Sequence, residues 1–319
     1  MVDQPESVVV HTPEIPELKK VKDGKVRSIF EFDGGLLLFV ASDRISARDK
    51  VLRPGIPGKG RVLNSMSTLF FQLTFGIAPN HMVREEQLPP PSRQRLAELY
   101  EAYPWLSGRT MVVRAGQVVP IEFIFRAHST GSFYKAYTES GGFEKGATVL
   151  GYYCPLGMKN GDPFPEPIFT PSTKAPAGEH DVNVTYEKAY EHLLRETDLG
   201  VSKARRVLNW GQTRGLALTT WGYRYAREHG FILADHKIEV VLVQGGVELI
   251  GDELFTPDSS RFLRLEDFER GNIVHYDKEP VREELDEMWA GKSTPPRLRQ
   301  GAVEETAQRY RAIHDALVV

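Results

Sequence analysis

Residues 237–254 read KIEVVLVQGGVELIGDEL, in which two apolar runs flank the pair Gly245-Gly246. Glycine accepts the positive φ that a tight turn requires, so the stretch predicts a β-hairpin with a two-residue turn. A two-residue turn fixes the register and sets Glu239 directly opposite Asp252 on one face. Their Cβ atoms would then lie about 5 Å apart. The chain must therefore form a sheet that tolerates two like charges at one end of a hairpin.

Facing carboxylates destabilise a strand pair unless another group compensates for their charge. A divalent cation held by both acids is one such group, and Mg²⁺ bound together with phosphates is commonly held in this way. Lys237 projects from the same face as Glu239. A lysine beside two acids and a metal is typical of a nucleoside triphosphate site. The alternative is that this end of the hairpin is solvated and that the two acids diverge.

The remaining pattern mixes strands and helices without a regular βαβ rhythm, which favours an α+β architecture over a doubly wound sheet. Alternating apolar residues predict a hairpin around DGG at 33–35 and two strands within 109–128. A long loop is expected at 141–183, and such loops usually carry function. Helical spacing covers 62–77, 184–197, 213–230, 282–292 and 303–318. We place a β-rich domain at 1–116 and a larger α/β domain at 117–319.

Bulk properties exclude several classes of function. A net charge of −3 argues against non-specific nucleic-acid binding. The single cysteine, Cys154, rules out an intrachain disulfide and fits a cytoplasmic location. No apolar run approaches the roughly 20 residues of a membrane helix, and the first residues lack the pattern of a signal peptide. We therefore expect no membrane partner. The sequence does not indicate an oligomeric state.

Two glycine-rich segments have the composition of phosphate-binding loops. In GKVR, Lys25 and Arg27 alternate onto one face after Gly24, so backbone amides and two cations could cover phosphates. The alternative is an exposed basic edge strand. GIPGKGRVLN, at 55–64, lacks the spacing of a Walker motif. It precedes a helix, so it either holds an anion at the helix N-terminus or is a tight connecting loop.

Three further segments gather polar residues near chain turns. RAHSTGSFYK places Arg126 and Ser132 where a strand enters a helix, which suits a phosphate monoester or a carboxylate, or else a plain helix cap. PIFTPSTKAPAGEHDVN carries Lys174 and Asp181 within the long loop. In TPDSSRF, Arg261 is the residue best suited to an anion, and a turn capped by Asp and Ser is the alternative.

Taken in order, these segments resemble the SAICAR synthetase family from about Gly24 to Arg282. The matching stretches are GKVRSIF, ASDRISA, IPGKGRVLN, VVPIEFIFR with TGS, PIFTPSTKA, HD, ADHK with E, and GDELFTPDSSRF. One stretch alone would be weak, but the ordered set is specific. The resemblance implies an ATP-dependent ligase that joins L-aspartate to carboxyaminoimidazole ribonucleotide and releases ADP and phosphate. It also implies a small β-rich domain over a larger α/β domain, with ATP between them.

The resemblance implies a role for each matching residue. The loop over the ATP phosphates corresponds to Gly24, Lys25, Val26 and Arg27, and the hinge beside adenine to Val118 and Val119. The nucleotide and Mg²⁺ site corresponds to Lys237, Glu239 and Asp252, with both acids as metal ligands. The grip on the ribonucleotide corresponds to Arg126, Ser132 and Arg261. Polar positions that line the cleft correspond to Asp49, Lys174 and Asp181. We expect the catalytic groups to be Lys237, Asp252, Lys174 and Asp181.

The chain departs from the family pattern at several positions, among them Arg48, Val182, His236 and Leu263. Arg48 stands where the family has an aromatic residue, so it could bind an acidic ligand. These departures keep open a paralogue that runs the same ligation on another heterocyclic carboxylate, for example a pyrazole nucleotide in nucleoside-antibiotic synthesis. A nucleotide-binding protein without ligase activity is the alternative from a different class. Retention of Lys237, Glu239 and Asp252 counts against that last alternative.

Overall fold

The protein is described here from a computed structural model, in which residues 8–10, 12–174, 181–289 and 294–318 are described. The N-terminal part builds a four-stranded antiparallel sheet in the order β1-β2-β3-β6. Its strands are β1 (Lys20–Asp23), β2 (Arg27–Glu31), β3 (Leu36–Ala41) and β6 (Thr110–Arg114). Alternating apolar residues such as Leu38 and Val40 point to α2 (Pro90–Ala102), which covers the sheet with Leu96 and Leu99.

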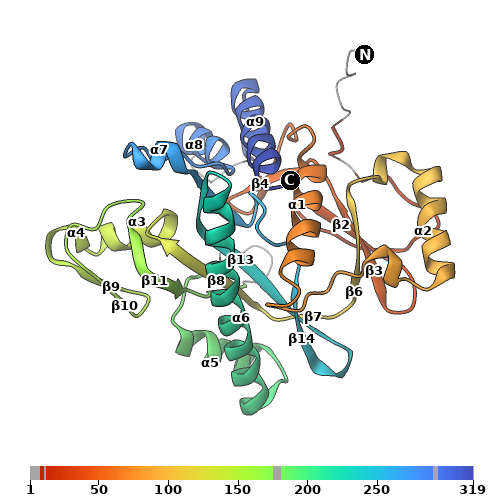
Figure 1. Cartoon of the computed structure of the whole chain (residues 1–319), viewed down its shortest axis with the longest axis horizontal. Coiled ribbons are helices and arrows are strands. Elements are labelled where there is room, and N and C mark those ends of the chain that lie inside the picture. Colours follow the sequence, from red (N-terminus) through yellow and green to blue (C-terminus); the bar gives the residue numbers. More distant parts are fainter. Residues whose placement is uncertain (1–7, 11, 175–180, 290–293, 319) are drawn as a thin grey trace.

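The second sheet is larger and lies beside the first (Figure 1). Its path is β11 (Pro163–Phe169), β8 (Ile121–His128), β13 (Phe231–Val243) and β14 (Val247–Gly251). The strands β7 (Gln117–Val118), β12 (Ser172–Thr173) and β15 (Ser260–Arg264) pair along its sides. Its ladders are antiparallel throughout the described residues. This arrangement confirms the α+β prediction.

One long helix, α6 (Gly200–Glu228), packs along one face of the large sheet, and α5 (Tyr186–Glu196) packs on α6. The helix approaches so closely because it presents glycines. A Cβ at Gly211 would lie 2.2 Å from the Phe123 ring, and one at Gly215 would lie 1.9 Å from the Phe125 ring. Here the glycines are required by the close packing of helix against sheet.

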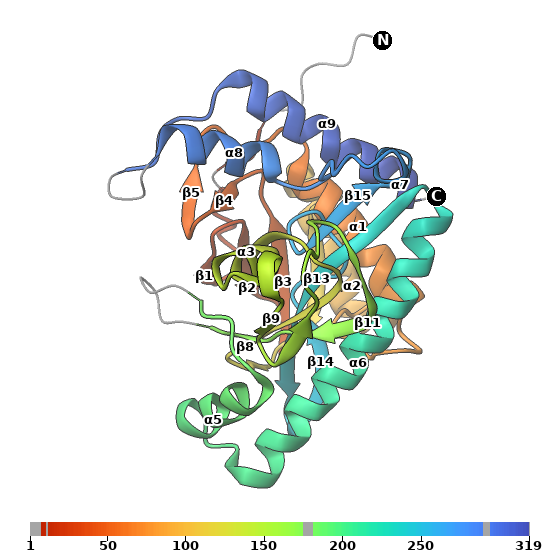
Figure 2. The same ribbon diagram turned by 90° about the vertical axis from the view of Figure 1, so that its left-hand side faces the viewer.

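The C-terminal helices α8 (Glu279–Met288) and α9 (Gln300–Leu317) lie at the opposite end of the molecule from α5 (Figure 2). They pack on β4 (Ile45–Ala47) and β5 (Lys50–Leu52) of the N-terminal part. α9 also contacts α1 (Lys59–Leu73), whose apolar face joins the core above the large sheet. The apolar core is thus continuous across residues 116 and 117, and the domain boundary stays a prediction.

The predicted loop at 141–183 contains regular structure, so that part of the prediction is wrong. It includes α4 (Gly142–Lys145), β9 (Ala147–Val149) and β10 (Tyr152–Cys154) as well as β11 and β12. The short strands were missed because glycine and proline interrupt their alternation. The remaining short helices are α3 (Gly131–Glu139) and α7 (Leu265–Glu269), with 3₁₀ turns at Glu85–Gln87, Pro104–Leu106 and Gln244–Gly246. Within the described chain, no helix has the length and apolarity needed to cross a membrane.

Candidate active site

Strand β13 carries a row of charges on one face. Asp235, Lys237 and Glu239 lie on the same side because alternate residues of a strand point the same way. The ion pairs are Asp235 with Arg126 (3.0 Å) and Arg261 (2.5 Å), Lys237 with Glu122 (2.5 Å), and Glu239 with Lys174 (2.5 Å). The structure therefore gathers residues from four separate segments along one strand.

The hairpin at the end of this row has a different register from the predicted one. Its turn has three residues, Gln244–Gly246, and Glu239 pairs with Gly251. The prediction that Glu239 lies directly opposite Asp252 is wrong. Asp252 instead follows the end of β14 and has a left-handed φ of 61°. This backbone conformation directs the Asp252 carboxylate to Arg27 of the small sheet.

Arg27 connects the two sheets at this point. Its guanidinium pairs with Asp252 and, at 3.3 Å, with Glu253. Burial alone would raise the pKa of Asp252, but Arg27 and then Lys237 hold that pKa below its usual range. Burial raises the pKa of Glu253 above its usual range. The pKa values of the two neighbouring acids are therefore shifted in opposite directions.

The same cluster keeps Lys237 charged. Burial would lower the pKa of the Lys237 ammonium, but Glu122 and Glu239 raise it above its ordinary value. Lys174 and Arg27 add two further cations. A polyanion that enters this cluster would exchange these protein carboxylates for its own phosphate oxygens.

The donor set suits Mg²⁺ only if a ligand completes it. Glu239 and Asp252 offer hard carboxylate oxygens, which Mg²⁺ prefers. No group of three or more acids, histidines or cysteines that could hold a metal occurs among the described residues. Two carboxylates fit an ion that keeps its waters and takes phosphate oxygens from a nucleotide. The assignment of Glu239 and Asp252 as metal ligands stays a prediction.

The segment predicted to cover the ATP phosphates is a tight turn ahead of β2. The Gly24 amide donates to the Arg27 carbonyl at 2.8 Å. The Val26 carbonyl accepts from the Ser42 amide at 3.0 Å and from its hydroxyl at 2.8 Å, which ties the turn to the end of β3. Lys25 extends outward and pairs with Asp49 at 2.5 Å.

A second cationic group lies around Asp235 and the start of α3. The Arg126 guanidinium donates to Thr170, at 2.9 Å, and to Ser132, at 3.3 Å. Gly131 has a φ of 55°, and a Cβ there would lie 2.5 Å from the Arg261 guanidinium. Both facts require glycine. Arg126, Ser132 and Arg261 thus converge at one helix N-terminus, as predicted for an anion-binding group.

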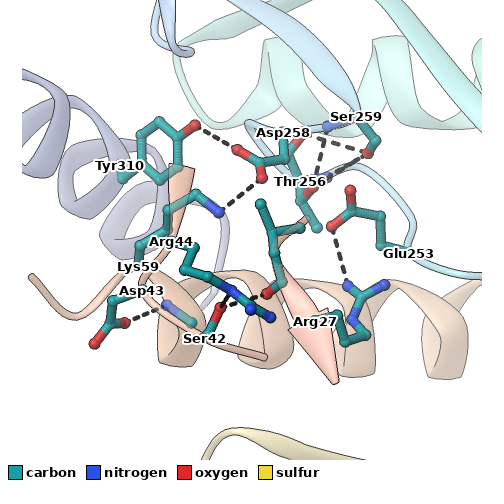
Figure 3. A network of polar contacts seen from close by, with 12 residues as sticks. Arg27, Ser42, Asp43, Arg44, Lys59, Glu253, Thr256, Asp258, Ser259 and Tyr310 are labelled. Carbon is teal, nitrogen blue, oxygen red and sulfur yellow. Dashed lines mark hydrogen bonds and ion pairs between the residues drawn. The ribbon is translucent and has the colours of Figure 1, made fainter. Parts of the chain in front are cut away.

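The glycine-rich segment at 55–64 holds an anion of the protein itself (Figure 3). Asp43 accepts from the Gly60 amide at the start of α1. It also forms a double ion pair with Arg109, at 2.7 and 3.0 Å. Next to it, Lys59 pairs with Asp258 at 2.7 Å, and the Tyr310 hydroxyl donates to the other Asp258 oxygen at 2.6 Å. We call these residues, Asp43, Lys59, Gly60, Arg109, Asp258 and Tyr310, the α1 network.

The remaining predicted residues lie around the row of charges. Val118 is exposed in β7 beside Val241, and Val119 is buried. Asp181 follows the segment 175–180, which lies outside the described residues. Arg48 contacts α8 and the residue that follows it, because it pairs with Asp286 and donates to the Trp289 carbonyl. The proposed binding of substrate by Arg48 stays a prediction.

Two other departures from the family pattern lie in the core. His236 lies on the α6 side of β13, where its Nε2 is 2.9 Å from the Thr219 hydroxyl. That hydroxyl donates to the Gly215 carbonyl, so His236 Nε2 carries the proton. Leu263 is fully buried in an apolar cluster with Ile232. Val182 is exposed beside Thr173.

Sequence reasoning missed several charged residues of this region. Asp235 had a readable signal, because 235, 237 and 239 alternate as D-x-K-x-E along a strand. Glu122 and Glu253 gave no local signal, since their partners are distant in the chain. Lys278 is partly buried, and this burial lowers the pKa of its ammonium despite the nearby Asp258. Two surface pockets, of about 490 and 720 Å³, are lined by none of the predicted site residues.

Comparisons with known proteins agree with the resemblance seen in the motifs. A sequence model of the SAICAR synthetase family matches residues 20–297. The phosphoribosylaminoimidazole-succinocarboxamide synthase of Desulfotalea psychrophila is 39% identical over 303 residues, which cover 94% of this chain and 95% of that protein. A solved SAICAR synthase is 32% identical with a TM-score of 0.77, over 97% of this chain and 98% of that one. The Saccharomyces cerevisiae enzyme, solved with SAICAR, has the same identity and coverage and a TM-score of 0.74.

Proposed function

Since the chain belongs to the SAICAR synthetase family, we propose that it is an ATP-dependent ligase that joins L-aspartate to carboxyaminoimidazole ribonucleotide in purine biosynthesis. The observation that carries the proposal is the charged face of β13. Asp235 and its arginines lie at one end of this row, and Glu239 with its lysine lies at the other. The four residue steps from Asp235 to Glu239 span about 13 Å of strand.

The two ends of the row suit the two ends of a ribonucleotide carboxylate. Arg126, Ser132 and Arg261 would hold the phosphate at the N-terminus of α3, where charge-assisted hydrogen bonds favour an anion. The carboxylate would then reach toward Lys237 and Glu239, next to the ATP phosphates. The row therefore sets the carboxylate beside the phosphoryl donor.

The chemistry requires this arrangement because a carboxylate is a poor electrophile. Transfer of the ATP γ-phosphoryl group to the carboxylate oxygen releases ADP and forms an acyl phosphate. The aspartate amine then attacks the acyl carbon and loses a proton, and the carbon–oxygen bond to phosphate breaks. Holding the amine against the acyl phosphate contributes about 7–11 kcal/mol of barrier reduction in such reactions. The protein needs no covalent nucleophile of its own.

The cations of the cluster stabilise the phosphoryl transfer. Lys237 stays charged between Glu122 and Glu239, and Arg27 and Lys25 approach from the small sheet. Mg²⁺ held by Glu239 and Asp252 would supply further positive charge to the transferred phosphoryl group. On ATP binding, Arg27 would exchange Asp252 for phosphate oxygens, which frees that carboxylate for the ion. Val118 would contact the adenine ring.

The same ligation on another heterocyclic carboxylate is the alternative that the test must distinguish. The departures from the family pattern at four positions keep this alternative open: Arg48, Val182, His236 and Leu263. Two of these, His236 and Leu263, are buried within the fold, and Arg48 contacts α8. These three side chains therefore lie outside the charged face of β13, which favours the imidazole substrate.

A ligation assay tests the proposal directly. The purified protein receives ATP, Mg²⁺ and L-aspartate with either carboxyaminoimidazole ribonucleotide or a pyrazole carboxylate ribonucleotide, and ADP release is measured. We expect turnover of the imidazole substrate with a kcat/KM at least about tenfold above that for the pyrazole. A preference for the pyrazole would replace the substrate assignment. ATP binding without ADP release in either mixture would contradict ligase activity altogether.

A further inference from the structure

Helix α9 begins at Gln300, beyond the stretch 20–297 that matches the family's sequence model. Much of its contact with the body is apolar, through residues such as Ile313 and Leu317. One polar contact reaches the loop between β14 and β15, residues 252–259. There the Tyr310 hydroxyl donates to an oxygen of Asp258 at 2.6 Å (Figure 3).

The β14–β15 loop connects both halves of the candidate site. It begins with Asp252 and Glu253, which contact Arg27. It ends at β15, whose second residue, Arg261, pairs with Asp235. Asp258 lies three residues before Arg261, in the turn from Thr256 to Ser259 that leads directly into β15.

Asp258 is held from two sides. Lys59 of α1 pairs with one carboxylate oxygen at 2.7 Å, and Tyr310 of α9 donates to the other. The side chains of Lys59 and Asp258 are 0% and 5% exposed, and Tyr310 is 1% exposed. Buried carboxylate oxygens that lose a donor are costly to leave unpaired, so the loop is expected to shift when either donor is removed.

We propose that α9 is a positioning element of the ligation site, and that Tyr310 acts through Asp258 to fix the β14–β15 loop and thereby Arg261. Tyr310 touches no substrate in this proposal. Its effect passes through one carboxylate to the loop that presents the predicted phosphate-binding arginine. The kinetic part of the proposal rests on the proposed function, whereas the structural part does not.

The variant Tyr310→Phe tests this role, with Tyr225→Phe as a matched control. Tyr225 also donates to α9, to the Leu317 carbonyl at 2.8 Å, but it lies on α6 and its hydroxyl is directed to the end of α9 rather than to Asp258. Both variants remove one hydroxyl that anchors α9. We expect Tyr310→Phe to raise the KM for the ribonucleotide carboxylate about tenfold and to change kcat and the KM for ATP less than about twofold. A remote phosphate contact is made equally in the ground state and the transition state, so its loss appears in KM.

Two kinetic outcomes would overturn the proposal. If Tyr310→Phe lowers only the melting temperature and leaves all KM values unchanged, Tyr310 is merely structural. If Tyr225→Phe raises the same KM equally, general loosening of α9 is the cause. Failure of the wild-type protein to ligate either nucleotide would instead contradict the proposed function.

Hydrogen exchange of the wild-type protein tests the proposal without an activity measurement and does not depend on whether a variant folds. We expect the amides of the β14–β15 loop, including Leu254 and Ser259, to open together with α9, with the same free energy and denaturant dependence. In Tyr310→Phe, exchange of the loop amides should accelerate more than in Tyr225→Phe. If the loop amides open independently of α9, Tyr310 does not fix the β14–β15 loop.

Discussion

The charged residues of this protein fall into two regions that behave differently. In the α1 network, Asp43, Arg109 and Lys59 are buried, and each has a partner of opposite charge within the protein. In the row along β13, the pairs Lys237–Glu122 and Lys174–Glu239 are partly open to solvent. Both regions contain motifs that match the same family. Burial, rather than motif, therefore distinguishes these two pairs from the α1 network. The Arg126–Asp235 pair of the same row is nearly as buried as the network, so only an anionic ligand could replace its carboxylate.

The contrast follows from desolvation. Opening a buried ion pair exposes an uncompensated charge to a low-dielectric interior, so such a pair stays closed unless a ligand brings a replacement charge. A pair with one exposed partner exchanges that partner for water or for a phosphate at little cost. The anion at the N-terminus of α1 is accordingly Asp43 of the chain, whereas an anion at the N-terminus of α3 would come from a substrate.

The largest expected effect is on folding, in the α1 network. Asp43→Asn leaves the Arg109 guanidinium buried without a counter-charge, so we expect the free energy of unfolding to fall by about 3–5 kcal/mol. Urea denaturation measures this change. The double variant Asp43→Asn with Arg109→Met should recover part of the loss, because it removes the unpaired charge. A loss below about 1 kcal/mol would contradict the conclusion that the buried ion pair between Asp43 and Arg109 holds the fold together.

The next effect is on turnover, in the row along β13. Glu239→Gln and Asp252→Asn should each lower kcat at least about 100-fold in the ligation assay, since each removes a predicted Mg²⁺ ligand, and about 100-fold corresponds to about 2.7 kcal/mol of barrier. Glu239→Gln should change the free energy of unfolding by less than about 1 kcal/mol, because Lys174 is 38% exposed. Near-normal turnover in both variants would refute the metal assignment.

The two regions also differed in how far the sequence predicted them. The row along β13 was accessible because strand alternation puts Lys237 and Glu239 on one face, and the same rule would have found Asp235. The register of the β13–β14 hairpin could not be predicted, because Gln244 joins Gly245 and Gly246 in the turn and shifts every cross-strand partner by one residue. The α1 network was inaccessible, since Asp43, Arg109 and Tyr310 are brought together only by packing. Its motif, IPGKG, instead resembles a phosphate loop.

A smaller effect concerns the pH dependence of the unfolding free energy and His236, which lies on the side of β13 that faces α6. Burial lowers the pKa of His236 from about 6.5 to about 3, so the folded state keeps it neutral while the unfolded state binds a proton. The stability present above pH 6.5 is therefore lost as the pH falls from about 6.5 toward 3. At pH 5.5 the loss is about 1.4 kcal/mol from this residue.

The variant His236→Gln isolates that contribution. It keeps a donor for Thr219 but does not titrate, so the difference in unfolding free energy between pH 7 and pH 5.5 should shrink by about 1.3 kcal/mol, since about 0.2 kcal/mol is already lost at pH 7. His81, whose pKa burial also lowers to about 3, remains in both proteins and cancels. An unchanged pH dependence would mean that His236 is accessible to protons in the folded state.

The smallest effect is expected at Arg48, whose ion pair is more exposed than the pairs of the α1 network and of the row along β13. Arg48 pairs with Asp286 at the surface, where the side chains are 40% and 63% exposed. Exposed pairs contribute about 0–1 kcal/mol, so Arg48→Phe, which restores the aromatic residue of the family pattern, should change the unfolding free energy by less than about 1 kcal/mol. Asp286→Asn should do the same. If Arg48 contacts only α8, both variants leave the KM values for aspartate and nucleotide within about twofold. A rise of about tenfold in the aspartate KM for Arg48→Phe alone would show that Arg48 leaves Asp286 for the substrate, because an exposed pair is exchanged for a ligand at little cost.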